Sequence, residues 1–307
     1  MQAVARYIMR GRMQAILAAA VAALLSLLLP PLNYISSAVI ALVTLRRGWR
    51  EGLVIIAGAA VAMALFAGVT PVDPLRAVLL AAAIWVPTWL MALVLRRTVS
   101  LSFTVSVAAV AGGLIVVAVY LGMDNPALAW RDMLEHLVEQ AQEQNELVAA
   151  DALGKMLMDA APHMTGMLVA ALILGLTLSL FLARWWQALL YNPGGFRREV
   201  YALRLGRYFA LATLGVVVVS MAASGWVAEV AANVLIVMAA AYLLHAMGLL
   251  HGVIAAKGIH VAWLITVYAV SLILPQAVLI FVAVAFIDSW MDIRARLIKD
   301  GSVSHDA

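Results

Sequence analysis

Long apolar runs, separated by short polar segments, cover most of the 307-residue chain. A helix needs about 20 apolar residues to cross the hydrocarbon core of a bilayer. The last run, 260–287, is longer than one crossing and carries Pro275 and Gln276 in its middle, so we divide it into two. The pattern predicts an all-α, polytopic integral membrane bundle of about eight to ten transmembrane helices. The other runs are 13–29, 35–45, 53–69, 77–95, 99–121, 164–183, 208–224 and 227–250.

Some of these segments are shorter than a full crossing, namely 35–45 and the two halves of 260–287. A helix over 35–45 is about 17 Å long, against about 30 Å of hydrocarbon. Lipid cannot form hydrogen bonds with the unpaired backbone groups at the ends of such a helix. The segment therefore packs behind other helices or borders a water-filled cavity. Transporters commonly bind their substrates beside helices of this kind. A tilted span with different ends is the alternative interpretation.

Basic residues are divided unequally between the two sides of the predicted membrane. In the ten-span arrangement 17 of the 20 Lys and Arg residues lie on one side, and only Arg76, Arg131 and Lys155 lie on the other. Because Lys and Arg near span ends are retained in the cytoplasm, the asymmetry predicts a multi-pass membrane protein with both termini cytoplasmic. An arrangement of nine spans would place the carboxyl terminus and three of these basic residues outside, and it agrees less well with the retention of basic residues in the cytoplasm. The first basic and apolar segment mimics a signal peptide, lacks a small-x-small cleavage site, and is expected to remain as the first helix.

A polar segment, 123–162, interrupts the apolar pattern. It carries eight acidic residues against Arg131 and Lys155, and its apolar residues recur at helical spacing. One or two amphipathic helices fit this spacing, with Pro126 and Pro162 as breakers at the two ends. We expect an external helical insert, which is either a hairpin packed on the helix ends or a lid over an outward-facing pocket.

The composition excludes several classes of protein. Hydrophobic residues make up 66% of the chain and charged residues 12%, and the mean hydropathy is +1.03. Soluble domains are only about half apolar, so lipid must solvate this chain. There is no Cys, which excludes disulfides and thiolate chemistry. The sequence pI is near 9.6, but the bases are dispersed in short loops, and we therefore expect no nucleic-acid partner.

No catalytic motif appears in the sequence. We find no metal-ligand spacing among the six His residues, no glycine-rich phosphate loop and no nucleophile elbow. Asp288, Asp292 and Arg296 are spaced four residues apart, and an intrahelical Asp–Arg ladder explains them without chemistry. We expect no catalytic residues, no enzymatic activity, no metal and no cofactor.

Few polar residues lie at membrane depth. Ionisable groups there are costly and are therefore functional candidates. Glu229 and Asn233 share one helix face, and His245 lies further along the same span. We predict these three as buried polar residues. A single buried His is either part of hydrogen-bonded packing or a proton carrier.

Ligand-binding candidates occur in the amino-terminal half. Trp85 and Trp89 lie one turn apart at mid-span and flank Pro87. Because membrane Trp prefers the interface, two at mid-depth beside a helix-kinking Pro predict an aromatic pocket wall. Ordinary helix packing is the alternative. Asn33 and Tyr34, near the expected outer face, are the other predicted ligand-binding residues.

The segment 184–207 is the most distinctive local sequence. Pro193 and Gly194 suit the central positions of a type II turn, which requires positive φ at its third residue. Phe196 would then be displayed beyond the turn. We predict that Phe196 and Arg197 bind a cytoplasmic partner; a basic loop that only fixes topology is the alternative.

The amino-terminal sequence carries a family resemblance. Ala15, Ala19 and Ala23 form a stripe of small residues that lets helices approach closely. Together with Pro30-Pro31-Leu32-Asn33, a short helix and Arg47-Gly48-Trp49-Arg50-Glu51-Gly52, this stripe resembles the start of the substrate-binding subunits of energy-coupling-factor vitamin transporters. The resemblance implies that the alanine stripe meets a transmembrane coupling subunit and that a ligand binds near the outer face.

A second resemblance covers essentially the full length of the chain. The runs 192–199, 203–207 and 288–296 look like the corresponding parts of the YybS-like family of bacterial polytopic membrane proteins. That family is itself distantly similar to the substrate-binding subunits of energy-coupling-factor transporters. The resemblance implies a protein of the bacterial cytoplasmic (inner) membrane. The six-helix core of the transporter subunits would correspond to 13–183 here, and the four additional helices and the acidic insert depart from that core.

These patterns predict a division into four regions and a transport-related function. We expect a small-molecule-binding membrane subunit without its own ATPase, in contact with the bilayer and with a membrane coupling subunit. The alternative is a membrane scaffold or envelope assembly protein that docks a cytoplasmic partner. The regions are a six-helix membrane core at 13–183, a cytoplasmic loop at 184–207, carboxyl-terminal membrane helices at 208–290 and a cytoplasmic tail at 291–307.

Overall fold

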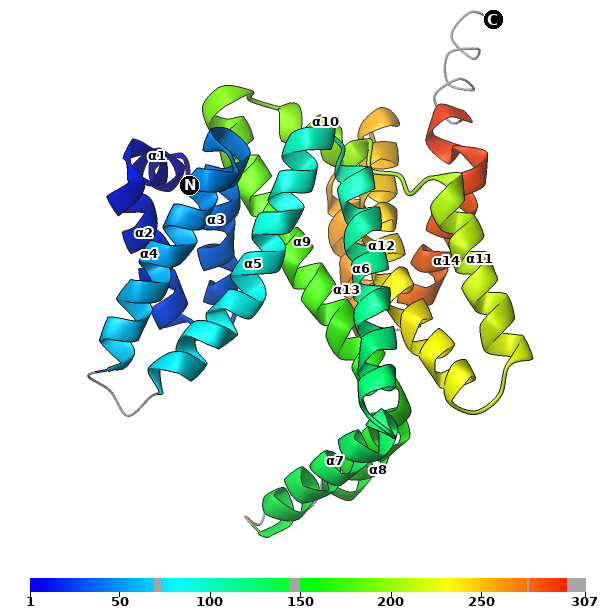
Figure 1. The fold of residues 1–307 in the computed structure, drawn as a ribbon. Coiled ribbons are helices and arrows are strands. Elements are labelled where there is room, and N and C mark those ends of the chain that lie inside the picture. Colours follow the sequence, from blue (N-terminus) through cyan, green and yellow to red (C-terminus); the bar gives the residue numbers. More distant parts are fainter. Residues whose placement is uncertain (69–72, 144–149, 275, 297–307) are drawn as a thin grey trace, which may run out of the picture. The chain divides into compact units, whose positions relative to one another are not determined.

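The fold is entirely helical. The computed structural model contains 14 α-helices, one short 3-10 turn and no strand in the part of the chain that it describes (Figure 1). This confirms the predicted all-α class. The described residues are 1–68, 73–143, 150–274 and 276–296, with backbone alone at 141–143 and 150–153.

Five helical stretches are long and apolar enough to cross a membrane, judged by length and composition. They agree with the prediction of a multi-pass membrane protein. Shorter apolar helices accompany them, and these are α2 (Arg12–Leu25), α11 (Arg207–Ala222), α13 (Ala262–Ile273) and α14 (Ala277–Met291). The five long stretches are α4 (Trp49–Ala67), α5 (Pro74–Thr98), α6 (Leu101–Gly122), Gly154–Tyr191, which contains α9 (Met164–Tyr191), and α12 (Trp226–Ala256).

The chain forms two compact units. Unit 1 comprises Met1–Val105 and Leu174–Leu203, and unit 2 comprises Ser106–Ile173 and Arg204–Ala307. Helices α6 and α9 contribute residues to both units.

The central element of unit 1 is α3 (Leu32–Arg47). Every residue from Ser36 to Leu45 is buried, and α2, α4 and α5 all pack against this helix. The prediction that the short segment 35–45 packs behind other helices is confirmed. The helix extends beyond that apolar run at both ends and has 16 residues.

An additional helix, α1 (Gln2–Arg10), precedes α2 in unit 1. It buries Ala5 and Ile8, and the Arg47 Nη2 donates to the Met9 carbonyl at 2.7 Å. The turn between α3 and α4 depends on Gly48, whose φ of +105° lies in the region that favours glycine.

In unit 2, α12 packs against both α11 and α14. An aromatic cluster lies where these helices meet. The Tyr242 ring is centred 5.5 Å from the Phe209 ring and 5.7 Å from the Phe286 ring. Because aromatic side chains bury large areas, the cluster fixes the three helices against one another.

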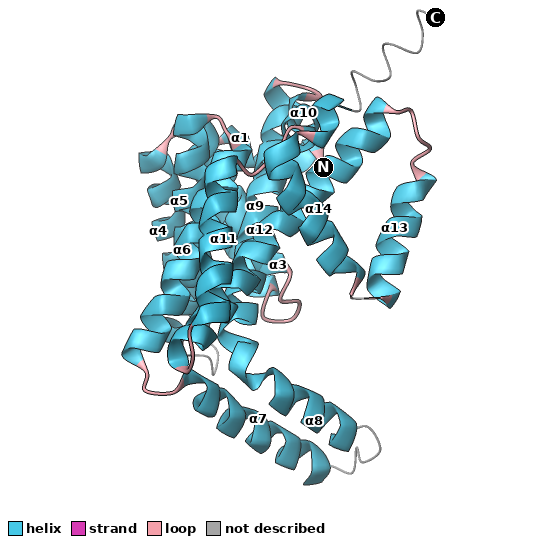
Figure 2. Cartoon of the chain, turned by 90° about the vertical axis from the view of Figure 1, so that its right-hand side faces the viewer, coloured by secondary structure: helices cyan, strands magenta, loops and turns pink. Residues whose placement is uncertain are grey.

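The last apolar run forms two helices, as predicted. The helices α13 and α14 have 12 and 15 residues, and Figure 2 shows both of them extending upward from the break between them. Gln276 is the N-cap residue of α14, and Pro275 lies outside the described residues.

The acidic insert forms a helical hairpin in unit 2. Its helices α7 (Pro126–Glu143) and α8 (Ala150–Ala160) lie side by side (Figures 1 and 2). The Trp130 Nε1–H donates to the Thr165 Oγ1 at 2.9 Å, which anchors the hairpin to α9. The predicted amphipathic helices are therefore present, and residues 144–149, which carry Glu146, lie outside the described part.

Candidate functional site

The alanine stripe of α2 is buried within the chain. Ala15, Ala19 and Ala23 are 1%, 0% and 1% exposed, and α2 packs on α3 and α4. The Ala19 carbonyl accepts a hydrogen bond from the Ser36 Oγ at 2.7 Å. The expectation that this stripe meets a separate coupling subunit is therefore wrong. The small side chains instead allow α3 and α4 of the same unit to pack closely on α2.

Asn33 and Tyr34 lie in the first turn of α3. The Tyr34 ring covers Gly175 of α9, where a Cβ would overlap the ring. The Asn33 Oδ1 is buried and has no hydrogen-bond partner among the described residues. A buried acceptor without a partner is costly, so of these two residues Asn33 retains a polar atom that a ligand could satisfy.

Trp85 and Trp89 have different environments. Trp85 is fully buried, and its Nε1–H donates to the Ser36 Oγ at 3.0 Å. Trp89 is partly exposed and donates from Nε1 to the Trp49 carbonyl at 3.2 Å. Both indoles hold α5 against neighbouring helices, which agrees with the packing alternative. The predicted aromatic pocket wall is not formed by Trp85, because its ring is enclosed by protein.

The segment after α9 contains the predicted turn. Gly194 has φ +80° and ψ −11°, the values of the third residue of a type II turn. The short helix α10 (Gly195–Tyr201) follows at once. Phe196 is not displayed as expected, because its ring packs edge-on against Phe181, with centroids 5.8 Å apart.

Arg197 remains on the surface of α10. Its Nε–H donates to the Tyr201 hydroxyl at 2.8 Å, and its guanidinium lies over the same ring. Arg184 makes a bidentate ion pair with Glu199, which fastens α10 to α9. Of the two predicted partner contacts, the structure leaves only the Arg197 side chain exposed.

Asn233 is fully buried in unit 2 and joins several elements. Its Nδ2, which carries two hydrogens, lies 3.1 Å from the Tyr120 hydroxyl oxygen, 2.8 Å from the Pro162 carbonyl oxygen and 2.9 Å from the Glu229 carbonyl oxygen. Its Oδ1 accepts from the Gly166 N–H at 2.6 Å. Asn233 was predicted to be buried. Its hydrogen bonds hold α12 against the start of α9 and the residues just before it, which is a structural role. Glu229, on the same helix, is only partly buried.

The third predicted buried polar residue, His245, has an acidic partner. His245 of α12 and Asp288 of α14 are both 0% exposed, and the His245 Nε2 lies 2.8 Å from the Asp288 Oδ2. The other carboxylate oxygen of Asp288 accepts from the Ile293 N–H at 2.6 Å. The His245 Nδ1 is buried without a hydrogen-bond partner among the described residues.

Two arginines complete this polar cluster. Arg294 Nη2 lies 3.5 Å from the Asp288 Oδ2. Arg204 donates to the Asp288 carbonyl at 3.0 Å and to the Asp292 Oδ2 at 2.8 Å. We use the name Asp288 cluster for these residues: Arg204, His245, Asp288, Asp292 and Arg294.

The predicted Asp–Arg ladder on one helix is wrong. Asp292 ends α14 in the left-handed conformation, with φ 48° and ψ 65°, so residues 288, 292 and 296 do not continue along one helix face. The Arg296 Nε–H instead donates to the Met291 carbonyl at 2.9 Å. Both aspartates pair with residues far away in the sequence, which helical spacing could not indicate.

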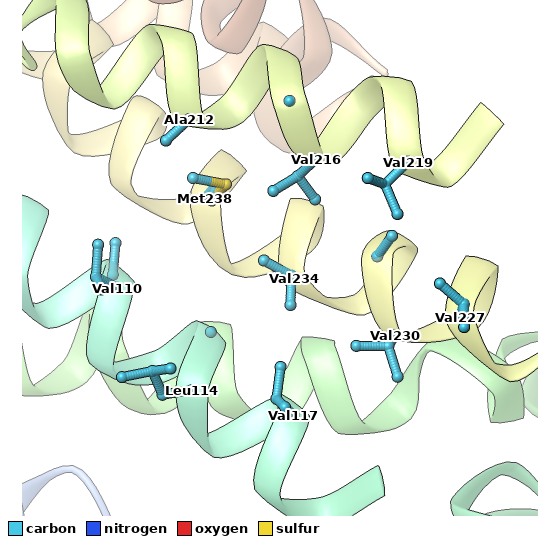
Figure 3. A pocket seen from close by; sticks show the side chains of 14 residues that line it. Val110, Leu114, Val117, Ala212, Val216, Val219, Val227, Val230, Val234 and Met238 are labelled. Atoms are coloured by element: carbon cyan, nitrogen blue, oxygen red, sulfur yellow. The ribbon is translucent and has the colours of Figure 1, made fainter. Parts of the chain in front are cut away.

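Unit 2 also contains an apolar cavity of about 470 Å³ between α6, α11 and α12, which is open at the surface: its lining residues Val110 and Leu114 are 51% and 65% exposed. Figure 3 shows Val, Leu and Met side chains from all three helices around this space. Small residues on each helix, including Gly113, Gly215 and Ala231, leave the space open. The lining residues are Ala109, Val110, Gly113, Leu114, Val117, Ala212, Gly215, Val216, Val219, Val227, Val230, Ala231, Val234 and Met238.

Sequence reasoning missed this cavity and the acidic partner of His245. Glycine and alanine recur on α6 and α11 without a motif that distinguishes a hollow from close helix packing. Among the described residues there is no group of three or more His, Asp or Glu side chains suited to a metal ion. No family model, no curated protein and no solved structure matches the chain.

Proposed function

We propose that the protein is a transport-related membrane subunit that binds a small apolar or amphipathic molecule in the cavity of unit 2. It has no ATPase of its own. The observation that carries the proposal is the cavity of about 470 Å³, since small-molecule sites have volumes of about 300–1,000 Å³. The resemblance of the sequence to transporter substrate-binding subunits supports the same function.

The lining determines the chemical class of the ligand. All 14 lining residues are Ala, Val, Gly, Leu or Met. A polar ligand would lose its hydrogen bonds to water there without replacement, at a cost of several kcal/mol. An apolar body loses nothing comparable, and each buried methylene contributes about 0.8 kcal/mol. The ligand therefore places a hydrocarbon portion in the cavity.

Filling the cavity should abolish binding. A Cβ at Gly215 would meet no atom within 4 Å, so Gly215→Phe can place its ring in the cavity without displacing the backbone. We expect a thermal-shift screen of apolar and amphipathic compounds to find molecules that stabilise the wild type. A ligand at 100 times its Kd should add about 2.7 kcal/mol to the free energy of unfolding.

The matched control is Leu214→Phe on the same helix. Leu214 is 46% exposed and does not line the cavity. This variant should keep the ligand-induced stabilisation, whereas Gly215→Phe should lose it. Equal stabilisation of both variants by every compound that stabilises the wild type would show that binding occurs elsewhere.

We further propose that the protein lies in the bacterial cytoplasmic membrane with both termini in the cytoplasm. The chain has no native Cys, so single introduced cysteines report sidedness. Asp132→Cys, in the exposed surface of α7, should react with an impermeant thiol reagent in intact cells. Arg198→Cys, on α10, should react only after the membrane is opened. The reverse pattern would invert the proposed topology.

A scaffold that docks a cytoplasmic partner through 184–207 is the second candidate function. The exposed Arg197 and Arg198 on α10 favour it, whereas Phe196 is engaged with Phe181. In this case the double change Arg197→Ala, Arg198→Ala should remove a crosslinked partner and leave thermal stability unchanged. Identical crosslinking of wild type and double variant would exclude the docking role.

A further inference from the structure

We infer that His245 and Asp288 form a proton-binding site in unit 2, with the His245 Nδ1 as the atom that takes the proton. The inference rests on the proposed function in one respect: it makes the proton the coupling ion of the proposed transport. The proton site itself stands on the geometry of the Asp288 cluster.

The first observation is the arrangement of bonds around the imidazole. The His245 Nε2 lies 2.8 Å from the Asp288 Oδ2. Because an ionised carboxylate can only accept hydrogen bonds, Nε2 carries the hydrogen of this bond. In a neutral ring the lone pair then belongs to Nδ1. That atom is buried and lacks a hydrogen-bond partner among the described residues, so the bonds around the ring leave Nδ1 available to accept a proton.

The second observation is the position of the counter-charge. A buried imidazolium is costly unless an anion compensates it. The Asp288 carboxylate lies in direct contact and is itself 0% exposed. Histidine is also the side chain whose charge changes most readily between pH 5 and 8. When Nδ1 takes a proton from water, the pair changes from a neutral ring beside a carboxylate to an imidazolium–carboxylate pair.

The third observation concerns the charged groups that face the pair. With neutral His245 the cluster holds two carboxylates, Asp288 and Asp292, and two guanidiniums, Arg204 and Arg294, so its formal charge is zero. Among the described residues Tyr242 is a further titratable group beside the ring, with centroids 6.4 Å apart. A proton on His245 adds one positive charge, and this charge competes with Arg294 for the same carboxylate oxygen.

The arginines also connect the site to water. The Arg294 side chain is 12% exposed and the Arg204 side chain 30% exposed, whereas His245 and Asp288 are fully buried. Arg294 contacts the buried carboxylate and also reaches the surface, so it marks the side of the cluster from which a proton would arrive. The same helix, α12, carries both His245 and the cavity residues from Val227 to Met238.

The test is a pH titration of the full-length protein, labelled with ¹⁵N-histidine and reconstituted in phospholipid vesicles. Between pH 8 and pH 5 the two ring resonances of His245 should change from those of a neutral ring with distinct nitrogens to those of an imidazolium. His245→Gln removes and thereby assigns these resonances. If that variant does not fold, the more conservative Asp288→Glu should shift them and assign them instead. Asp288→Asn should prevent the change within this range.

A ring that keeps its neutral resonances throughout this range would overturn the proton site and leave a purely structural pair. The cavity variant Gly215→Phe separates this inference from the proposed function. It should titrate like the wild type, because the cavity is not part of the Asp288 cluster. Loss of the titration in Gly215→Phe, with the fold retained, would contradict the assignment of the proton to His245 and its neighbours alone.

Discussion

Replacing Asp288 with alanine is expected to lower the free energy of unfolding by about 3–5 kcal/mol, the range found when one partner of a buried ion pair is removed. The carboxylate is 0% exposed and accepts from the Ile293 N–H, His245 and Arg294. Its loss leaves the part-buried Ile293 N–H and the buried His245 N–H without their acceptor. Reversible unfolding in mixed micelles, followed by circular dichroism, measures the change.

The control for this prediction is Asp292→Ala. The Asp292 side chain is 45% exposed and pairs with Arg204, whose side chain is 30% exposed. Ion pairs that are open to solvent contribute about 1 kcal/mol or less, so this variant should be destabilised much less. Equal losses in the two variants would mean that the Asp288 carboxylate is not buried as described.

Asn233→Leu is expected to cost about 2–4 kcal/mol. The leucine has a similar shape but makes none of the four hydrogen bonds of the amide. A buried polar group left without a partner costs about 1–3 kcal/mol, and the Gly166 N–H and the Tyr120 hydroxyl are the groups most affected. The same unfolding measurement applies.

Asn33→Leu provides the matched comparison in unit 1. The Asn33 Oδ1 is buried and already has no partner among the described residues, so the same chemical change removes an unsatisfied acceptor. We expect little loss of stability or a small gain. A loss of stability as large as that of Asn233→Leu would show that the Asn33 side chain is hydrogen-bonded in the folded protein. Its Oδ1 would then not be available to bind a ligand.

The sequence predicted the helices well because their signals are local. The apolar runs indicated the helices, and the proline in the middle of 260–287 marked the break between α13 and α14. Helical spacing in the acidic insert indicated α7 and α8. The positive φ of Gly194 followed from its place after Pro193. Each of these features depends on a few neighbouring residues.

Partners distant in the sequence could not be predicted in the same way. The alanine stripe showed that α2 makes a close helix contact, but the sequence does not say whether the partner is α3 or another protein. His245 and Asp288 lie 43 residues apart and meet only when α12 packs on α14. Asp292 interrupts the expected ladder because it ends the helix in a left-handed conformation, a choice that residue spacing does not reveal.

The cavity, too, could not be predicted from the sequence, because it depends on contacts between apolar residues of different helices. Gly113 and Gly215 look like the small residues that allow close helix packing in membranes. Close approach does occur at Gly112, where a Cβ would crowd Val237, Ile173 and Val169. At Gly215 the same residue type leaves open space instead. The difference depends on how neighbouring helices diverge, which is a property of the folded unit.

The most direct test of the proposed function is native mass spectrometry of the full-length protein, released gently from its own membrane. The wild type and the Leu214→Phe control should carry a bound apolar or amphipathic molecule at a defined ratio, and Gly215→Phe should lack it. The same bound mass on all three proteins, or none on the wild type, would contradict the assignment of the cavity as a ligand site.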